Sequence, residues 1–103
     1  MRFETYSRFY DKMKSHMSLE AYAAYERPRE DKDGPDNISA LWSTVHTDVY
    51  SLRTDTKLSQ VKFAARYGIP TRTLEDWEAG KSNPTPYLIK LIAYTVYMDY
   101  ILK

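Results

Sequence analysis

Two short helical patterns separated by only a few residues occupy the stretch from Leu58 to Lys81. We expect Ser59 to cap the first, which runs through Tyr67 to a glycine. Pro70 precedes the second, which ends before another glycine. Glycine at a helix end adopts the left-handed backbone that stops the helix, and proline fixes the geometry of a restart. Two helices joined this tightly must cross steeply, so the spacing predicts a helix-turn-helix unit.

The apolar side chains of this unit predict which face of each helix is buried. The first helix is expected to bury Val61, Phe63 and Ala64 in part, with the small Ala64 where the second helix presses on it. In the second helix, expected over residues 71–79, Leu74 and Trp77 share the inward face because they are three positions apart. Four side chains are left to face outward: Thr71, Arg72, Glu75 and Asp76.

The N-terminal part of the chain also has helical periodicity, and no segment of the sequence alternates for long enough to predict a strand. We expect a helix over residues 2–17 and a shorter one over residues 19–26, the latter capped by Ser18. Residues 27–37 contain two prolines, one glycine and seven charges, which predicts a solvated linker. The apolar face of the first helix consists of Phe3, Tyr6, Tyr10, Met13 and Met17.

Residues 38–52 carry one core-facing helical stripe, which Asn37 is expected to cap. The last helix, over residues 86–102, is apolar on nearly every side, so the N-terminal segment or a second subunit must cover what the helix-turn-helix leaves bare. Two hypotheses stay open for its tyrosines: packing against the N-terminal helix, or a subunit interface. These tyrosines are Tyr87, Tyr94, Tyr97 and Tyr100. The same choice applies to Tyr6, Phe9, Tyr10, Tyr22 and Tyr25.

The length of 103 residues suits one all-α domain with an appendage. We expect residues 1–37 to form an N-terminal helical extension with a charged linker, and residues 38–103 to form the helix-turn-helix domain. Cysteine is absent, which excludes disulfides and cysteine-ligated zinc and fits a reducing compartment. No signal peptide or membrane helix is visible, so we expect a cytoplasmic protein.

The net charge of +1 conceals an uneven distribution. Residues 1–51 hold 7 Lys and Arg against 9 Asp and Glu, giving −2, whereas residues 52–103 hold 8 against 5, giving +3. The basic excess therefore lies in the C-terminal half, and a polyanionic partner is expected to bind there.

A combination of short motifs in residues 53–96 is specific, although each piece alone is common. The pieces are Leu58-Ser59-Gln60, Phe63-Ala64, Gly68-Ile69, Leu74, Trp77-Glu78, Gly80-Lys81, Pro84, Leu88 and Leu91-Ile92. Together they resemble the Cro/repressor-type, or XRE-type, helix-turn-helix family. The resemblance implies a lambda-repressor-like, all-α fold that binds double-stranded DNA. Trp42 and the run from Tyr67 to Thr73 are also similar to small proteins of bacterial genomes and mobile elements.

The resemblance implies roles for single positions as well. The residues that would meet base edges in the major groove are Thr71, Arg72 and Asp76. The residues that would bind phosphate are Gln60, before the recognition helix, and Lys81 to Asn83, after it. Arg53 and Glu78 stand where many relatives have a buried ion pair.

The chemistry of these side chains supports DNA contact independently. The forked guanidinium of Arg72 matches O6 and N7 of guanine, a contact worth roughly 1–3 kcal/mol of discrimination. Thr71 and Thr73 supply hydroxyls for phosphate and methyl groups for thymine. Further positive charges, at Lys62, Arg66 and Lys81, add an attraction that is independent of sequence.

Two carboxylates on the recognition helix oppose this interpretation. Glu75 and Asp76 repel phosphate, although Asp76 is able to accept a hydrogen bond from cytosine N4. A local pair of Asp76 with Arg72 or Lys81 is the alternative expectation.

We expect sequence-specific binding of double-stranded DNA by a bacterial or mobile-element repressor. It would act as a homodimer that binds half-sites one helical turn, roughly 34 Å, apart. The alternative is a protein-interaction module on the same fold, either an antitoxin or a phage-encoded inhibitor such as an anti-CRISPR protein, whose N-terminal extension binds the partner protein. No catalytic triad, phosphate-binding glycine loop or metal-ligand cluster is visible, so we expect no enzyme activity, metal or cofactor.

Overall fold

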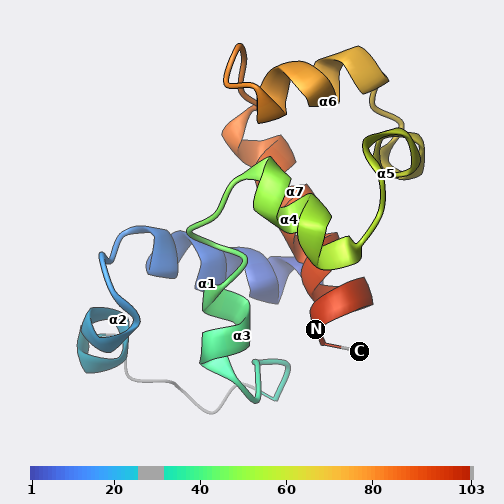
Figure 1. Cartoon of the computed structure of the whole chain (residues 1–103). Helices are drawn as coiled ribbons and strands as arrows, with labels where there is room; N and C mark the ends of the chain where they lie inside the picture. Colours follow the sequence, from blue (N-terminus) through green and yellow to red (C-terminus); the bar gives the residue numbers. More distant parts are fainter. Residues whose placement is uncertain (26–31, 103) are drawn as a thin grey trace.

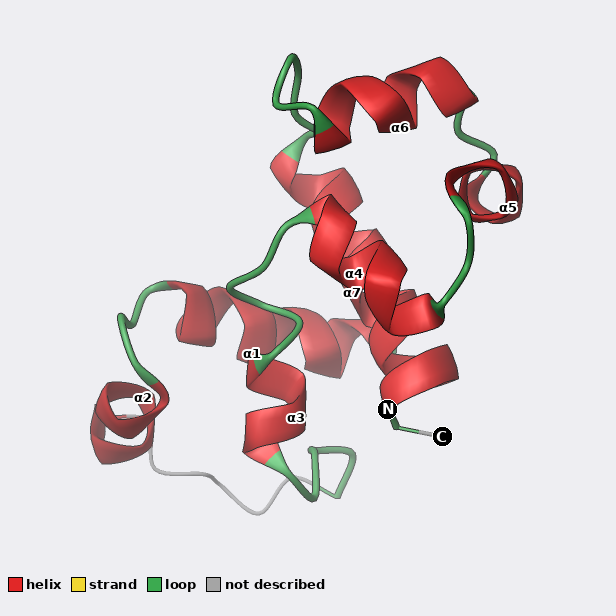
Figure 2. Cartoon of the chain, in the orientation of Figure 1, coloured by secondary structure: helices red, strands yellow, loops and turns green. Residues whose placement is uncertain are grey.

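The computed structural model describes residues 1–25 and 32–102, and this part of the chain consists of helices and loops without a strand (Figure 2). The all-α prediction is therefore confirmed for the described residues. The elements are α1 (Phe3–Lys14), α2 (Leu19–Tyr25), α3 (Ile38–Trp42), α4 (Val49–Thr56), α5 (Gln60–Tyr67), α6 (Thr71–Glu78), α7 (Pro86–Val96) and the π-helical turn η1 (Tyr97–Ile101). Helix α7 runs through the middle, with α1, α2 and α3 toward one end and α5 and α6 at the other (Figure 1).

Side-chain caps start most of these helices. The predicted caps are confirmed: the Ser18 hydroxyl accepts from Ala21 N at 3.0 Å, and the Asn37 side chain accepts from Ser39 N at 3.0 Å. Thr85 caps α7 in the same way, and Pro86 occupies the first turn, where its missing N–H costs nothing. These contacts satisfy amide groups that the first turn of a helix leaves without partners.

The expectation that one continuous helical stripe spans residues 38–52 is wrong, because the structure divides this segment into α3 and α4. The Ser43 and Thr44 hydroxyls donate to carbonyl oxygens three residues back, which closes the end of α3. Asp48 then caps α4 by accepting from Ser51 N at 2.8 Å. The apolar residues of the stripe still face the core, since Leu41, Val45, Val49 and Leu52 are all buried.

The N-terminal helix supplies the cover that α7 requires. Tyr6 is fully buried, and its ring lies 5.2 Å from that of Tyr94 and 5.7 Å from that of Tyr97. Lys90 on α7 donates to Ser7 Oγ at 2.9 Å and pairs with Asp11 at 2.8 Å. Packing against the N-terminal helix is therefore the arrangement of Tyr94 and Tyr97. Tyr6, Tyr10 and Tyr22 are likewise buried within the chain, whereas the side chain of Tyr25 lies outside the described part.

The predicted C-terminal ends of the first and the last helix need correction. Helix α1 stops at Lys14 instead of residue 17, and Met17 is fully exposed rather than on the apolar face. Helix α7 stops at Val96, and the chain continues as η1, in which Leu102 N donates to Tyr97 O at 2.8 Å. This five-residue spacing widens the last turn, a feature that apolar periodicity alone does not reveal.

The expected solvated linker is attached to the start of α1 through Asp33. The Asp33 carboxylate accepts from the Thr5 hydroxyl at 2.6 Å and from Arg2 N at 2.9 Å. These hydrogen bonds, that of Thr5 first, lower the pKa of Asp33 to about 2. Residues 26–31 of the predicted second helix and linker lie outside the described residues.

Tyr6→Phe tests whether the extension is part of the folded unit. The Thr44 hydroxyl donates to Leu41 O, so it accepts its 2.7 Å bond from the Tyr6 O–H. Losing this buried bond is expected to lower the free energy of unfolding by about 1–2 kcal/mol, measured by urea denaturation.

Tyr97→Phe is the matched control. It makes the same change in the same aromatic cluster, but the Tyr97 hydroxyl is buried without a hydrogen-bond partner among the described residues. Stability is expected to stay equal or rise. Equal losses in both variants would contradict the assigned hydrogen bond.

Candidate functional site

Helices α5 and α6 form the predicted helix-turn-helix, and both end in the same way. Gly68 ends α5 with φ +66°, and Gly80 follows α6 with φ +76°. After α5, Ile69 N donates to Ala64 O at 2.9 Å; after α6, Lys81 N donates to Asp76 O at 2.9 Å. A left-handed residue followed by this backward bond stops a helix and turns the chain, and glycine adopts it without strain.

The packing of α6 on α5 follows the predicted faces except at one residue. Leu74, Phe63 and Ala64 are buried, and Trp77 is half-buried against the same core. Val61 was expected to be partly buried but is 64% exposed. It lies two positions before Phe63, and two positions rotate a helix by more than half a turn, so the two side chains point to opposite sides.

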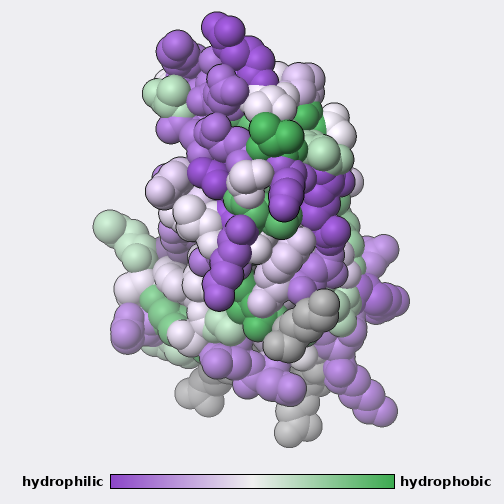
Figure 3. All heavy atoms as spheres, turned by 45° about the vertical axis from the view of Figure 1, so that its right-hand side comes forward, coloured by the Kyte–Doolittle hydropathy of each residue, from purple (hydrophilic) through white to green (hydrophobic). Residues whose placement is uncertain are grey.

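Helix α6 lies at the end of the molecule opposite α1, α2 and α3 (Figure 1). The same end is mostly hydrophilic in the space-filling view (Figure 3). Arg72 has 80% of its side chain exposed, and its Nε lies 3.5 Å from Asp76 Oδ1, one turn further along the helix. The outward face of α6 thus carries a charge pair, and Thr71 and Thr73 beside it are half-exposed.

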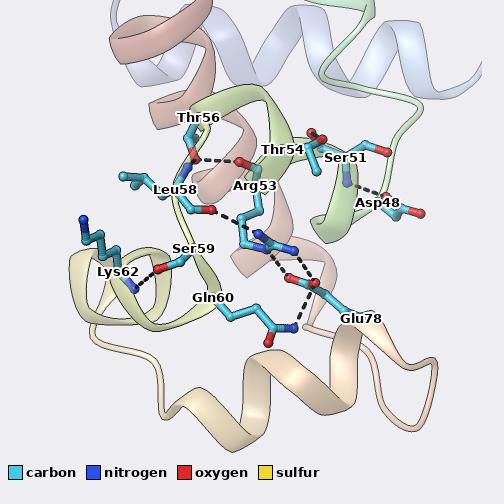
Figure 4. A network of polar contacts seen from close by, with 10 residues as sticks. All are labelled: Asp48, Ser51, Arg53, Thr54, Thr56, Leu58, Ser59, Gln60, Lys62 and Glu78. Atoms are coloured by element: carbon cyan, nitrogen blue, oxygen red, sulfur yellow. Dashed lines mark hydrogen bonds and ion pairs between the residues drawn. The ribbon is translucent and has the colours of Figure 1, made fainter.

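A polar network on the inward face ties α6 to the helices before it (Figure 4). Arg53 on α4 donates from Nε to Glu78 Oε2 at 2.7 Å and from a terminal nitrogen to Glu78 Oε1 at 2.9 Å. It also donates to Leu58 O at 3.0 Å. Gln60 on α5 donates to Glu78 Oε1 at 3.2 Å. One carboxylate therefore joins α4, α5 and the end of α6.

This ion pair is largely shielded from water, with 15% of the Arg53 side chain and 7% of the Glu78 side chain exposed. The hydrogen bonds from Arg53 hold the pKa of Glu78 below its ordinary value. The ring of Tyr50 lies 5.4 Å from the Arg53 guanidinium. Sequence reasoning missed Tyr50 and the link from Gln60 to Glu78. The three-residue spacing of Tyr50 and Arg53 was the available signal for the former.

The residues expected to bind phosphate differ in their exposure and in whether their polar groups already have partners. Lys62, Lys81 and Asn83 are exposed, whereas Gln60 is half-buried and uses one amide hydrogen on Glu78. Arg66 is directed away from this group, since it pairs with Asp99 on η1 and lies over the ring of Tyr100 at 5.4 Å. Its charge is engaged at the C-terminal turn.

The described residues contain no cluster of three or more His, Asp and Glu side chains that could hold a metal ion. No helix in this part of the chain is long and apolar enough to cross a membrane.

The segment that carries this geometry matches a known family. Residues 49–93, from the start of α4 into α7, match the family model described as helix-turn-helix. This segment is an XRE-type helix-turn-helix domain. At the level of the family, it is the domain of a DNA-binding transcription regulator, and the resemblance inferred from residues 53–96 is confirmed. The comparison with curated proteins gave no match, and neither did the comparison with solved structures.

Glu78→Gln is expected to lower the free energy of unfolding by about 2–4 kcal/mol, because the charge of Arg53 would then stay buried without its counter-ion. Urea denaturation measures the change. Glu75→Gln, an exposed site on the same helix, is the control and is expected to stay within about 0.5 kcal/mol of the wild type. A small change in both variants would contradict a structural role for the pair.

The lowered pKa of Glu78 predicts a pH dependence. Its ionised form stabilises the fold fully above the ordinary glutamate pKa of about 4.3, and the contribution is lost as pH falls toward the lower folded-state pKa. The difference in unfolding free energy between wild type and Glu78→Gln should therefore shrink as pH falls below about 4.3. A difference that stays constant from about pH 7 to about pH 3 would contradict the shift.

Proposed function

We propose that the protein is a transcriptional repressor that binds a specific double-stranded DNA sequence by inserting α6 into the major groove. The observation that carries the proposal is the position of α6. It is anchored on its inward face by Leu74 and Glu78, and its outward face lies at one end of the molecule. Helices placed in this way enter the major groove in helix-turn-helix proteins.

The proposed base contacts come from Thr71, Arg72 and Asp76. Arg72 presents several donors to guanine, Thr71 offers a hydroxyl and a methyl group, and Asp76 offers an acceptor. Their exposure supports the proposal, because base edges in the groove are accessible only to side chains that project from the helix.

The proposed phosphate contacts flank α6 on both sides. Lys62 lies in the first turn of α5, which Ser59 caps by accepting from Lys62 N at 3.2 Å, and Lys62 is exposed. The exposed turn after α6 adds donors on the other side. With Thr73 on α6 itself, the complete proposed set is Gln60, Lys62, Thr73, Lys81 and Asn83.

We further propose that a homodimer in the bacterial cytoplasm binds two half-sites about one helical turn apart and represses by occluding the promoter. We also propose that the protein is of bacterial or mobile-element origin and that residues 1–37 bind a protein partner.

A second function is favoured by the charges of α6. Arg72 is balanced by Asp76, and the exposed Glu75 adds a further negative charge. An outward face without net positive charge suits a protein partner, as in an antitoxin or a phage-encoded inhibitor such as an anti-CRISPR protein. DNA binding is favoured because the whole 49–93 segment belongs to a DNA-binding family.

Selection of bound DNA from a random pool tests the proposal. We expect one enriched motif, in two half-sites about 10 base pairs apart. Arg72→Ala is expected to weaken binding to that motif by about 5-fold to 100-fold while leaving non-specific binding nearly unchanged. Fluorescence anisotropy at several salt concentrations measures both affinities.

Lys81→Ala and Lys32→Ala provide a matched pair of charge removals. Lys81 follows α6, whereas Lys32 lies beside Asp33, which is bound to α1. Lys81→Ala should reduce the salt slope of binding by about one, and Lys32→Ala should leave it unchanged. No enriched motif and no binding at low salt would favour the protein-interaction alternative.

A further inference from the structure

In the exposed ion pair on α6, the carboxylate of Asp76 lies at the Nε side of the Arg72 guanidinium. Asp76 Oδ1 lies 3.5 Å from Nε of Arg72, one helical turn away. Long side chains on a helix lean toward its N-terminus, which brings the later residue of such a pair onto the earlier one. Asp76 has 32% of its side chain exposed against 80% for Arg72, so the acid is the more fixed partner of the two.

We propose that Asp76 is a positioning residue, which holds the Arg72 guanidinium in the orientation that distinguishes guanine from adenine. This inference rests on the proposed function, since it concerns how α6 selects its DNA sequence. It assigns Asp76 an action through Arg72, in place of the direct base contact proposed for it above.

The geometry of the guanidinium supports this role. Because the carboxylate lies beside Nε, at 3.5 Å, the two terminal amino groups of Arg72 remain available as a pair of donors. Guanine presents two acceptors in the major groove, O6 and N7, which match that pair. Adenine presents one acceptor, N7, and one donor, the N6 amino group. One of the two arginine donors would therefore face the N6 donor of adenine. A fixed fork rejects adenine, whereas a freely rotating one turns a single donor toward N7.

The pair has little effect on the free protein, because an exposed ion pair in water is worth little. Its effect grows at a DNA interface, where water is excluded and charges interact more strongly. Pairing with Arg72 also offsets the repulsion between Asp76 and the DNA phosphates. Glu75, the next residue on the helix, is exposed and provides the comparison.

The test measures base preference in the DNA selected by four variants. The position contacted by Arg72 is the one whose guanine preference disappears in Arg72→Ala. Asp76→Asn keeps the side-chain shape and removes the charge. It is expected to reduce the preference for guanine over adenine at that position about fivefold, while the affinity for DNA stays equal or rises. Glu75→Gln removes the same charge beside it and should leave that preference unchanged.

The double variant Arg72→Ala with Asp76→Asn separates positioning from direct contact. In the Arg72→Ala background, Asp76→Asn should change no base preference. Thermal denaturation checks that each variant folds. The hydrogen bond from Lys81 N to the main-chain oxygen of Asp76 does not involve the substituted side chains.

Two results would overturn the inference. One is an unchanged preference for guanine in Asp76→Asn. The other is that Asp76→Asn removes a preference at another position, both in the wild type and in the Arg72→Ala background. Failure of the proposed function gives a different result, namely no enriched motif for the wild type.

Discussion

The carboxylate of Glu78 is the contact on which the placement of α6 depends. It accepts two hydrogen bonds from Arg53 on α4 and one from Gln60 on α5. Leu74 lies one turn earlier on α6, so the apolar anchor and the ionic anchor share one face of the helix. Arg72 and Asp76 each lie two positions before an anchor, which rotates them to the opposite side. The arrangement that holds α6 therefore also decides which side chains it presents.

Helix α7 links this motif to the N-terminal extension. It contacts α4 on one side and α1 on the other, and Lys90 and Tyr94 bond directly to residues of the N-terminal segment. The buried core accordingly contains Tyr6 and Met13 together with Phe63 and Leu74. The extension covers apolar surface of α7 that a short helix-turn-helix leaves bare, so the two parts share one core.

Local signals in the sequence predicted most of the fold. Caps such as Asn37 and Ser59, and stops such as Gly68, act within a few residues, so their effect is visible in the sequence itself. The break between α3 and α4 was missed because the apolar stripe continues across it, although Asp48 was a visible capping signal. The π-helical turn and the tie between Asp33 and α1 depend on packing between distant segments, which periodicity does not contain.

For the polar network that anchors α6, the sequence indicated the ion pair but not every contact. The family resemblance placed Arg53 and Glu78 together, but nothing local in the sequence shows that Gln60 shares the same carboxylate. The charge count likewise gave a basic C-terminal half, yet Arg66 is paired with Asp99 on η1 and Arg72 with Asp76. Together with Arg53, which pairs with Glu78, three of the basic residues described in this half are therefore balanced by acids of the same half.

This internal balance bears on how such a surface discriminates between DNA sequences. Attraction to the phosphate backbone scales with unbalanced positive charge, and the residues proposed to supply it on either side of α6 are the exposed Lys62 and Lys81. With little of that sequence-independent attraction, the proposed regulator would draw more of its affinity from the contacts that α6 makes with base edges. A near-neutral recognition helix is thus compatible with DNA binding. It lowers affinity for random sequence more than affinity for the correct one, and the ratio of these two affinities determines occupancy of a site among many competitors.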